Sequence, residues 1–328
     1  MTTALPLLDV KGLSLEFRTR SGIVQALDQV TIAVDKGEMV GVVGESGSGK
    51  SVMCYSLMGI LDSAGRVTGG TASFGGLDLL HAPEADRASI RGREMAMIFQ
   101  SPRTALNPIR SIGRQLEDVL RRHTTTLRDQ LKSRAIEALR QVRIPDPERR
   151  YAAYPFELSG GQCQRVMIAL ALASKPSLLI ADEPTTVLDV TTQAAIMDLV
   201  VELARSRHMA TLLITHDLGL AAEYCDRIVV MHAGHVVESA PTTTLFRAPR
   251  HPYTARLIAS MPYAAKHLSE LASIPGSFPD LRRSDLPHCR YSERCDRGLA
   301  RCTAPLESHE VDVGHHVACW NPLTLVPA

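Results

Sequence analysis

The chain has 328 residues, of which 45% are hydrophobic and 22% are charged, and its formal net charge is +1. This composition is typical of a globular protein that is long enough for one large domain and a smaller one. Because positive and negative charges nearly balance, the composition gives no sign of a nucleic-acid-binding surface, and we expect no nucleic-acid partner.

The N-terminal sequence and the apolar runs bear on where the chain acts. The opening MTTALPLLDVKG has neither a basic n-region nor a long apolar core, so we expect no signal peptide. The longest apolar run, residues 166–173, is far shorter than the ~20 residues that cross a bilayer. We therefore expect a cytosolic chain whose role at a membrane, if it has one, depends on partners.

Short β-branched runs alternate with helical patterns up to about Ser239, which is typical of an α/β domain with a largely parallel sheet. The predicted strands are residues 39–43, 95–99, 178–181, 212–215 and 228–231. A helix is predicted over residues 128–142, where apolar residues recur on one face. That face consists of Leu131, Ala135, Ala138, Leu139 and Val142. From Pro241 onward prolines recur and the strand pattern fades.

Residues 44–51 read GESGSGKS, after the apolar run MVGVV and before a helical pattern, and they match G-x-x-x-x-G-K-[ST]. In this motif backbone N–H groups wrap phosphates, Lys50 reaches the β/γ oxygens, and Ser51 offers its hydroxyl to Mg²⁺. An ordinary glycine-rich turn is the alternative, which the flanking strand and helix disfavour. The predicted nucleotide-phosphate site consists of Gly44, Glu45, Ser46, Gly47, Ser48, Gly49, Lys50 and Ser51.

The run LLIADEP, residues 178–184, predicts a buried strand that ends in two adjacent carboxylates. Burying such charges is unfavourable unless they meet a cation or a reacting water. Asp182 is placed to support Mg²⁺ through its water shell, and Glu183 could orient and deprotonate the attacking water. Alone, the pattern is also that of a surface turn; the P-loop upstream favours the catalytic interpretation.

Three further residues are candidates whose ordinary alternatives stay open. Gln100 follows the run MAMIF and could reach the metal or water, or could be a solvated loop residue. His216 follows TLLIT and could hydrogen-bond the γ-phosphate. Asp189, in TTVLD, could contact nucleotide or could only cap a helix.

The stretch FELSGGQCQR places Ser159, Gly160 and Gly161 directly before an apolar helical run. Glycine in a helix costs about 1 kcal/mol relative to alanine, so two glycines there require a reason. A helix N-terminus with small residues exposes N–H groups that bind anions. The sequence therefore predicts an anion site, and the P-loop of this chain already encloses its own phosphates.

Taken together, GESGSGKS, Gln100, LSGGQ, LLIADEP, VLD and TH resemble the nucleotide-binding domain of ATP-binding cassette (ABC) proteins. They follow the order and spacing of that family from Phe17 to about Ser239, and LSGGQ is the most specific of them. The resemblance implies an α/β P-loop NTPase fold with a RecA-like core, an antiparallel β subdomain and a helical subdomain at about residues 101–165. It implies ATP and Mg²⁺ as ligands, with Ser51 and Gln100 near the metal and Glu183, His216 and Gln100 in hydrolysis.

The resemblance also implies that two such domains pair head to tail. In that pair, Ser159 and Gly161 of one domain close on the γ-phosphate held by the P-loop of the other, which identifies the anion of the signature. Phe17 would stack on adenine, although an aromatic residue in LSLEF suits a core strand equally well. The implied nucleotide contacts beyond the P-loop are Phe17, Ser159, Gly160, Gly161, Gln162, Asp182 and Asp189.

Further segments narrow the resemblance to the ATPase subunits of oligopeptide and dipeptide permeases, relatives of the nickel importers. These segments are FQSPRTALNPIRSIGRQL, PTTVLDVTTQAAI and LFRAPRHPYTARLIASMP. The resemblance implies a nucleotide-binding domain at residues 1–240 and an extension at 241–328. Cys163 and Val187 depart from the residues usual in the family, which leaves local packing at the dimer interface open.

The implied function is ATP hydrolysis that drives peptide uptake from the cytoplasmic face of the inner membrane, to which the chain would bind peripherally. The implied partners are a second ABC ATPase that is a paralogue of this chain, two transmembrane permease subunits and an extracytoplasmic solute-binding protein. The segment from Gln100 to the helix near Leu116 would pass the motion to the permease. A nickel or other small-solute importer is one alternative. A cassette ATPase acting on DNA or ribosomes is another, against which stand the missing coiled-coil insertion and second cassette.

Four of the seven cysteines fall between residues 289 and 319, which in a reducing cytosol favours a metal site over disulfides. The subfamily tail implies a [4Fe–4S] cluster on them, while zinc and free thiols stay open as alternatives. The implied cluster ligands are Cys289, Cys295, Cys302 and Cys319. The other three, Cys54, Cys163 and Cys225, are predicted to be small core residues. Nearby histidines could be alternative ligands or ordinary surface residues, and they are His288, His309, His315 and His316.

Overall fold

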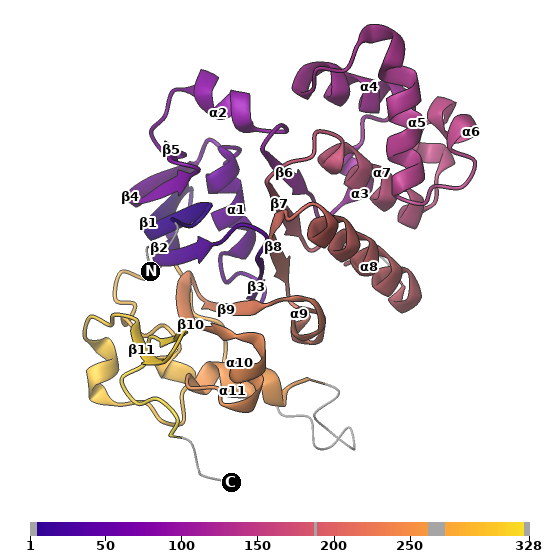
Figure 1. Cartoon of the computed structure of the whole chain (residues 1–328). Coiled ribbons are helices and arrows are strands. Elements are labelled where there is room, and N and C mark those ends of the chain that lie inside the picture. The colour runs from indigo at the N-terminus through magenta and orange to yellow at the C-terminus, as the bar shows by residue number, and fades with distance from the viewer. Residues whose placement is uncertain (1–4, 187–188, 262–272, 325–328) are drawn as a thin grey trace. The chain divides into compact units, whose positions relative to one another are not determined.

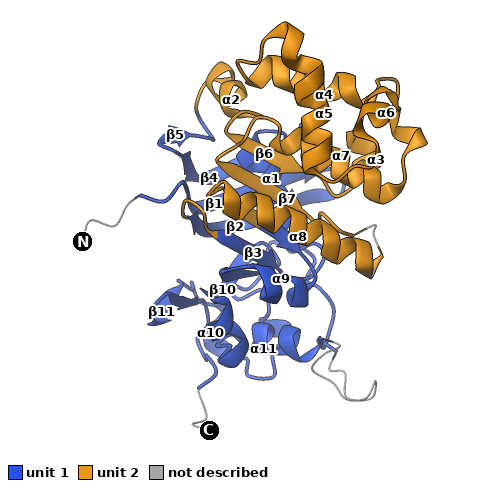
Figure 2. Cartoon of the chain, turned by 45° about the vertical axis from the view of Figure 1, so that its right-hand side comes forward, with its two compact units in different colours: residues 1–34, 39–81, 213–328 blue, residues 35–38, 82–212 orange. Residues whose placement is uncertain are grey.

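The computed structural model describes residues 5–186, 189–261 and 273–324. The chain forms two compact units, and Figure 2 colours them separately. Unit 1 comprises residues 1–34, 39–81 and 213–328, and unit 2 comprises residues 35–38 and 82–212. Val187, one of the two family departures, lies outside the described residues. Among the described residues, no helix combines the length and apolar character that a membrane crossing requires.

Unit 1 contains a four-stranded antiparallel sheet in the order β2-β1-β4-β5. Its strands are β1 (Leu8–Thr19), β2 (Gly22–Val34), β4 (Gly65–Phe74) and β5 (Leu77–Asp78). Leu8, Val10, Leu13 and Leu15 of β1 are buried. The alternation of period 2 along the strand is interrupted where its register with β2 shifts between Val10 and Leu13. This sheet was implied by the family resemblance and not by the residue patterns.

A second set of strands in unit 1 carries the P-loop. β3 (Met39–Val43) pairs in parallel with β9 (Arg227–His232), and every residue of β3 is buried. Such a continuous apolar run is typical of a parallel strand with both faces covered. β3 is followed by α1 (Lys50–Met58), and α9 (Leu218–Tyr224) contacts β3. In Figure 1 the first part of the chain is drawn in indigo and β9 in orange.

A tight hairpin joins β9 to β10 (His235–Pro241). Its two loop residues, Ala233 and Gly234, both have positive φ, at 49° and 85°. Two-residue hairpins need this left-handed backbone, which glycine adopts without strain. At the far edge of β10, β12 (His315–Val317) pairs antiparallel with it and β11 (His309–Asp312) follows, so two short strands extend the sheet where the sequence pattern fades.

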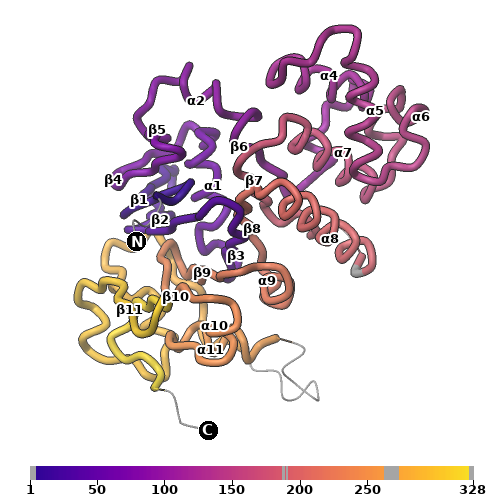
Figure 3. The backbone as a smooth tube through the Cα atoms, in the orientation of Figure 1, coloured from indigo at the N-terminus to yellow at the C-terminus, as the bar shows by residue number. Residues whose placement is uncertain are grey.

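The remainder of the C-terminal extension has little regular structure, as the tube of Figure 3 shows for the yellow part of the chain. It contains α10 (Thr242–Arg247), α11 (Pro252–Ala259) and two 3-10 turns, η5 (Ser292–Arg294) and η6 (Ala300–Thr303). Its centre is the buried carboxylate of Glu238 on β10. That carboxylate accepts hydrogen bonds from the backbone N–H groups of Arg250 and His251, and Nε2 of His315 lies 2.7 Å from it.

Unit 2 pairs β6 (Met95–Ile98) in parallel with β7 (Leu178–Asp182), and both strands are buried. The helices of unit 2 precede, separate and follow these two strands along the chain. They are α2 (Glu84–Ile90), α3 (Pro102–Ala105), α4 (Ile112–His123), α5 (Leu131–Gln141), α6 (Pro147–Ala152), α7 (Gly160–Leu172) and α8 (Val190–Ser206). β8 (Ala210–Thr215) runs from unit 2 into unit 1 along the chain.

The predicted strands and the predicted helix agree with the structure to within a few residues at their ends. α5 begins at Leu131, after a 3-10 turn at Arg128–Gln130, and its buried residues are Leu131, Ala135 and Leu139. These three come from the predicted apolar face. The three cysteines predicted as core residues, Cys54, Cys163 and Cys225, are also buried.

Candidate functional site

The P-loop of unit 1 is a compact turn between β3 and α1 whose glycines are required by the backbone. Gly44 has φ of 151°, and a Cβ at this position would lie 2.1 Å from the carbonyl oxygen of Met231. Gly49 caps α1 in the left-handed conformation. Only glycine fits these two positions without moving main chain, so the fold itself requires glycine at both.

Lys50 is folded back onto the loop that it follows. Its ammonium donates to the carbonyl oxygens of Gly44 at 2.7 Å and Glu45 at 3.0 Å, and to the hydroxyl of Ser48 at 3.3 Å. The residue is 5% exposed. These three acceptors are uncharged oxygens of the loop itself.

Two carboxylates end β7 in unit 2. Asp182 is 1% exposed, whereas Glu183, the next residue, leaves the strand with φ of 45°. Its Oε2 accepts hydrogen bonds from Nε2 of Gln100 and from the hydroxyl of Thr186, both at 2.8 Å. These two donors fix the carboxylate in one orientation. The structure therefore brings together Gln100 and Glu183, which the sequence proposed separately.

The signature residues form the entrance of α7. Ser159 is the N-cap: its hydroxyl accepts from the N–H of Gln162, whose side chain accepts in turn from the N–H of Ser159. A Cβ on Gly160 would meet nothing within 4 Å, so packing within the described chain does not require that glycine. A Cβ on Gly161 would lie 3.1 Å from Cγ2 of Thr192. The open space at Gly160 leaves the helix entrance accessible to another molecule.

The remaining predicted residues have simple local positions. Asp189 is the N-cap of α8, where its side chain accepts from the N–H of Thr192 at 3.0 Å, so the helix-cap alternative describes its contacts here. His216 follows β8 and is exposed. Phe17 lies on β1 and is half-buried, opposite Gly65 of β4; a Cβ on that glycine would come within 2.9 Å of the ring. The absence of a side chain at residue 65 leaves room for the Phe17 ring.

Comparison with known proteins identifies the family. Residues 27–186 match the family described as ABC transporter, and residues 237–302 match the family described as oligopeptide/dipeptide transporter, C-terminal region. The dipeptide transport ATP-binding protein DppD of Escherichia coli is 46% identical over 301 residues, which cover 92% of this chain and 91% of DppD. A putative peptide import ATP-binding protein of Brucella abortus is 47% identical over 300 residues, covering 92% and 90%.

The chain belongs to the ABC transporter ATPases. The dimeric structure of a post-hydrolysis state of the ATP-binding cassette MJ0796, bound to ADP and Pi, agrees with the fold. It superposes with a TM-score of 0.65 and 27% identity, over 72% of this chain and 98% of that one. The CbiO1 structure from Clostridium perfringens gives a TM-score of 0.62 over 74% of this chain and 92% of that one, with 26% identity.

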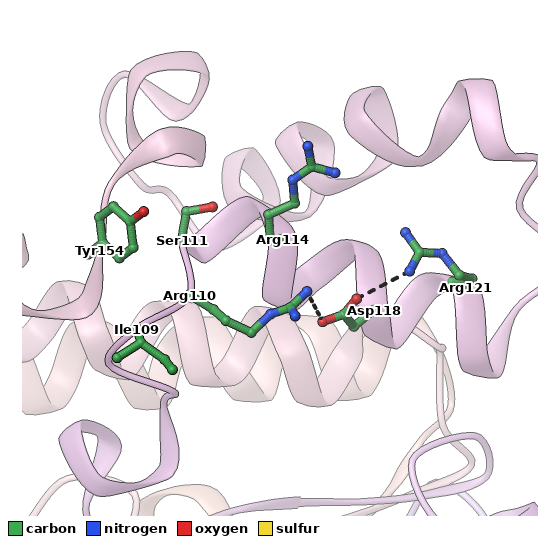
Figure 4. Close-up of a pocket in the computed structure, with 7 residues that line it drawn as sticks. All are labelled: Ile109, Arg110, Ser111, Arg114, Asp118, Arg121 and Tyr154. Atoms are coloured by element: carbon green, nitrogen blue, oxygen red, sulfur yellow. Dashed lines mark hydrogen bonds and ion pairs between the residues drawn. The ribbon is translucent and has the colours of Figure 1, made fainter.

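Unit 2 of this ABC ATPase also carries a surface pocket of about 480 Å³, which Figure 4 shows. Its lining residues are Ile109, Arg110, Ser111, Arg114, Asp118, Arg121 and Tyr154. Arg110 and Arg121 both reach Asp118, at 2.6 and 3.4 Å. Ile109 at its edge is 83% exposed, and Tyr154 stacks on the exposed ring of Phe156. Apolar groups exposed beside charged ones are typical of an interaction surface.

The four clustered cysteines of the ABC ATPase lie close to one another in unit 1. The N–H of Cys289 donates to the carbonyl of Cys302, and burial, followed by the neighbouring thiols of Cys302, Cys319 and Cys295, raises the pKa of Cys289 to about 12. Backbone N–H groups of Leu299 and Asn321 point at the sulfurs of Cys302 and Cys319, both at 3.4 Å. The fold thus gathers four buried or half-buried sulfurs.

In the described part of the chain, no three His, Cys, Asp or Glu side chains are placed to hold a single metal ion. The structure therefore supports neither the predicted iron–sulfur site nor the zinc alternative among the described residues. His288, His309 and His316 are exposed, as the surface alternative predicts. His315 is not a surface residue. It is fully buried, with its Nε2 2.7 Å from the carboxylate of Glu238.

Sequence reasoning missed several groups that contact the site. Thr186 holds Glu183, while Tyr253 and Arg294 of the extension contact Glu45 in the P-loop. Thr186 lies three residues from Glu183 and could have been found as a local hydroxyl. Tyr253 and Arg294 are more than 200 residues from Glu45, and a single sequence carries no signal for such pairs.

Proposed function

We propose that this ABC ATPase is the ATP-hydrolysing subunit of an importer for dipeptides or oligopeptides. The observation that carries the proposal is the match of residues 237–302 to the oligopeptide/dipeptide transporter C-terminal region, on the same chain as a complete P-loop. The names of the curated relatives, dipeptide transport and peptide import ATP-binding proteins, support the same cargo class. Their similarity extends over more than nine-tenths of the chain.

We assign the chemistry to the residues of the sequence motifs. Residues 44–51 would cradle the phosphates, with Lys50 on the β and γ oxygens. Glu183, oriented by Gln100 and Thr186, would accept a proton from the attacking water. His216 would donate to the γ-phosphate, and Phe17 would stack on the adenine. Mg²⁺, which neutralises phosphate charge when bound, would be held by Ser51, Gln100 and the water shell of Asp182.

The domain organisation proposed with this function has a nucleotide-binding domain at residues 1–240 and an extension at 241–328. The two family matches, 27–186 and 237–302, support a division near residue 240. The helical subdomain at about residues 101–165 would correspond to α3 through the entrance of α7.

Transport itself is tested by reconstitution. The chain is co-purified in detergent with its membrane partners and its extracytoplasmic binding protein, and the complex is placed in proteoliposomes with ATP on the side of this chain. Uptake of labelled dialanine or of a pentapeptide, lost in the Glu183→Gln variant, is the expected result. Uptake of Ni²⁺ without peptide uptake would favour the nickel alternative, and co-purification with ribosomes or DNA would contradict an importer.

A partner that supplies a second cassette is also proposed, with this chain peripheral on the cytoplasmic face of the membrane. The open space at Gly160 and the N-cap of α7 support an anion that comes from another molecule. The partner would be a paralogous ABC ATPase, and Ser159, Gly160, Gly161, Gln162 and Asp189 would face its nucleotide.

The Ser159→Arg variant tests this pairing. It should bind ATP as a single subunit but fail to form ATP-driven dimers with the partner, because the long side chain fills the helix entrance. Dimers are measured by size-exclusion chromatography in a Glu183→Gln background, which slows their decay. Ser133→Arg, on the exposed face of α5, is the matched control. Equal dimerisation of both variants would contradict the pairing.

The pocket of Figure 4 would receive one of the two permease subunits, and the partner cassette would receive the other. Four of its lining residues, 109, 110, 111 and 114, belong to the segment between Gln100 and Leu116 that is proposed to pass on the motion of hydrolysis. Exposed Ile109 offers an apolar contact, and the arginines beside it offer donors to carbonyl or carboxylate groups. Ile109→Glu should abolish co-purification with the permease while leaving ATP binding unchanged.

We also propose that Cys289, Cys295, Cys302 and Cys319 hold a [4Fe–4S] cluster. The donor set fits: four sulfurs gather in one place, and backbone N–H groups point at two of them. The cluster would supply folding free energy to a segment with little apolar core.

Anaerobic purification tests the cluster. The brown protein should contain about four irons and four acid-labile sulfides per chain. Cys319→Ser should remove the colour and make the extension sensitive to proteases. Cys225→Ala, a buried cysteine outside the group, should retain both. Zinc in place of iron, or no metal and an unchanged proteolysis pattern, would contradict the cluster and leave the ATPase assignment intact.

A further inference from the structure

Glu45, the second residue of the P-loop, is held by the C-terminal extension. The guanidinium of Arg294 donates to both carboxylate oxygens, from Nη1 to Oε2 at 2.8 Å and from Nη2 to Oε1 at 3.0 Å. The backbone N–H of Glu45 donates to the hydroxyl of Tyr253 at 3.0 Å. The extension therefore fixes both the side chain and the main chain of one P-loop residue.

The pair between Arg294 and Glu45 differs from the surface ion pairs of this protein. The Arg294 side chain is 5% exposed, so water screens the interaction poorly. Burial alone would raise the pKa of Glu45, but His232 and Arg294 together hold it at about 2. The carboxylate is therefore ionised at neutral pH, and Arg294 supplies the full charge that balances it.

Arg294 is itself fixed from several sides. It ends the 3-10 turn Ser292–Arg294, its Nε donates to the carbonyl of Pro275 at 2.8 Å, and it lies over the ring of Tyr291 at 5.7 Å. Tyr253 is fully buried, and its ring packs against Tyr291 at 5.3 Å. Both groups that hold Glu45 thus belong to one rigid aromatic and ionic cluster.

The contact continues from Glu45 into the phosphate-binding loop. The carbonyl oxygen of Glu45 accepts from the ammonium of Lys50 at 3.0 Å and from the N–H of Ser48 at 3.2 Å. A shift of residue 45 would therefore move the acceptor of Lys50 and the turn that shapes the loop. Among the described residues outside the P-loop, two side chains reach this carboxylate: His232 of β9, whose Nδ1 lies 3.5 Å from Oε2, and Arg294 of the extension. Burial lowers the pKa of His232, so Arg294 carries the charge.

We propose that Arg294 and Tyr253 are positioning residues of the nucleotide site, through which the C-terminal extension sets the affinity of the P-loop for nucleoside triphosphate. The inference rests on the proposed function only in that the P-loop binds ATP. Arg294 neutralises a carboxylate that stands beside a polyanion, and Tyr253 holds the main chain on which Lys50 rests. Without Arg294 the uncompensated charge of Glu45 repels the phosphates.

The test measures the dissociation constant of MgATP and MgADP by calorimetry on the full chain. Arg294→Met, which keeps most of the side-chain volume, should weaken ATP binding by about tenfold, within the range of couplings between neighbouring groups. ADP binding should weaken less, because ADP carries less charge. Adding Glu45→Gln to Arg294→Met should restore ATP affinity to within about threefold of the parent, since it removes the repelling charge. Tyr253→Phe should weaken both nucleotides by the same, smaller factor.

Arg256→Met is the matched control. Arg256 also lies in the extension and pairs with Asp296 at 2.6 Å, but its side chain is 40% exposed and touches no P-loop residue in the contacts described. Its ATP affinity should equal that of the parent. Loss of affinity in Arg256→Met as large as in Arg294→Met would overturn the inference.

Two further results would also overturn it: unchanged ATP binding in folded Arg294→Met, and failure of Glu45→Gln to restore binding. If Arg294→Met does not fold, two other variants test the proposal: the double variant, which leaves no unpaired charge, and Arg294→Lys. Arg294→Lys should bind ATP with intermediate affinity. Parental ATP affinity in Arg294→Lys would contradict the bidentate role of Arg294. A parent chain that fails to bind ATP would contradict the proposed function instead, so the two failures are distinguishable.

Discussion

The strands of the cassette bury almost only apolar side chains, whereas the C-terminal extension buries polar and charged side chains beside its apolar ones. β3 and β7 are continuous apolar runs, interrupted only by glycine and by the terminal Asp182, and all their residues are buried. The extension also buries His251 and His315. Glu238 of β10 accepts from the backbone N–H of His251 and lies 2.7 Å from Nε2 of His315. Apolar packing distributes stabilisation over many weak contacts, whereas a buried polar network depends on every partner.

Single substitutions should therefore destabilise the two regions in different ways. In the cassette, a change of one methylene in a strand alters stability in proportion to the volume lost. In the extension, loss of one partner leaves a desolvated donor or acceptor with none. We therefore expect the cassette to be sensitive mainly at its few chemical groups, and the extension to be sensitive at most of its buried polar ones.

The largest effect is expected in the cassette, at Glu183. Glu183→Gln keeps the shape and the partners of the side chain but removes the base, so ATP hydrolysis should fall by at least about 10²-fold. ATP binding should be retained, which separates this variant from Lys50→Ala, in which ATP binding itself should weaken. Steady-state phosphate release and nucleotide binding are measured in parallel, with Glu223→Gln on the exposed face of α9 as control. Near-normal turnover would remove Glu183 from the mechanism.

The next largest effect is expected in the extension, at Arg290, whose side chain is 2% exposed. Its guanidinium donates to the carbonyl oxygens of Ala233 and Gln25, at 2.6 and 3.0 Å, and to Asp28 at 3.2 Å. Arg290→Met removes this donor from two carbonyl oxygens and should lower the free energy of unfolding by about 2–3 kcal/mol. Urea denaturation measures the loss. A loss of unfolding free energy no larger than that caused by replacing an exposed arginine would contradict the expected difference between the two regions.

Acid should destabilise the extension through its buried histidines. Burial lowers the pKa of His251 to about 3, against about 6.5 in an unfolded chain. Below pH 6.5 the unfolded state therefore binds a proton that the folded state refuses, and stability is lost as pH falls from 6.5 toward 3. Between pH 7 and pH 5 this group alone should account for about 2 kcal/mol.

His251→Asn isolates that contribution, because asparagine can still cap α11 through the N–H of Tyr253 but does not titrate. The variant should lose less stability than the parent between pH 7 and pH 5 in urea denaturation. His232 and His235, whose pKa values burial also lowers, should retain part of the acid sensitivity in the variant. An unchanged pH dependence would show that His251 is protonated more easily than its burial indicates.

The smallest effect is expected at an exposed pair. Arg140 contacts Glu137 and Glu148 on the surface of unit 2, and both carboxylates are well exposed. Arg140→Ala should leave the free energy of unfolding unchanged within the error of urea denaturation, because water and salt screen such pairs. A loss comparable with that of Arg290→Met would mean that ion pairs matter here regardless of burial.

The sequence was most informative where function and local structure share one segment. Residues 44–51 predicted both the turn and its glycines, because positive φ and close approach to Met231 are needed at those positions. The apolar runs of β3 and β7 were recognised because no polar residue interrupts them. In the same way, Ser159 predicted a helix entrance that the structure contains as a capping box.

Long-range pairing was not predictable from one sequence. The antiparallel pairing of β1 with β2 includes register shifts that blur the period-2 pattern. The pattern GHHVAC gave no reason to separate His315 from His316, and only Glu238, 77 residues earlier, buries the first of them. Asp189 illustrates a third limit, since a helix cap and a nucleotide contact call for the same residue type in the same place.

The backbone at Glu183 has a consequence for how this protein can change. A residue other than glycine with φ of 45° is strained, by roughly 1–2 kcal/mol. Glycine or asparagine at this position would relieve the strain and raise thermal stability. Both would remove the carboxylate that Gln100 and Thr186 hold. Selection for heat resistance and selection for turnover therefore oppose each other at this position, and a thermostable variant that has lost its activity is the expected product of the first acting alone.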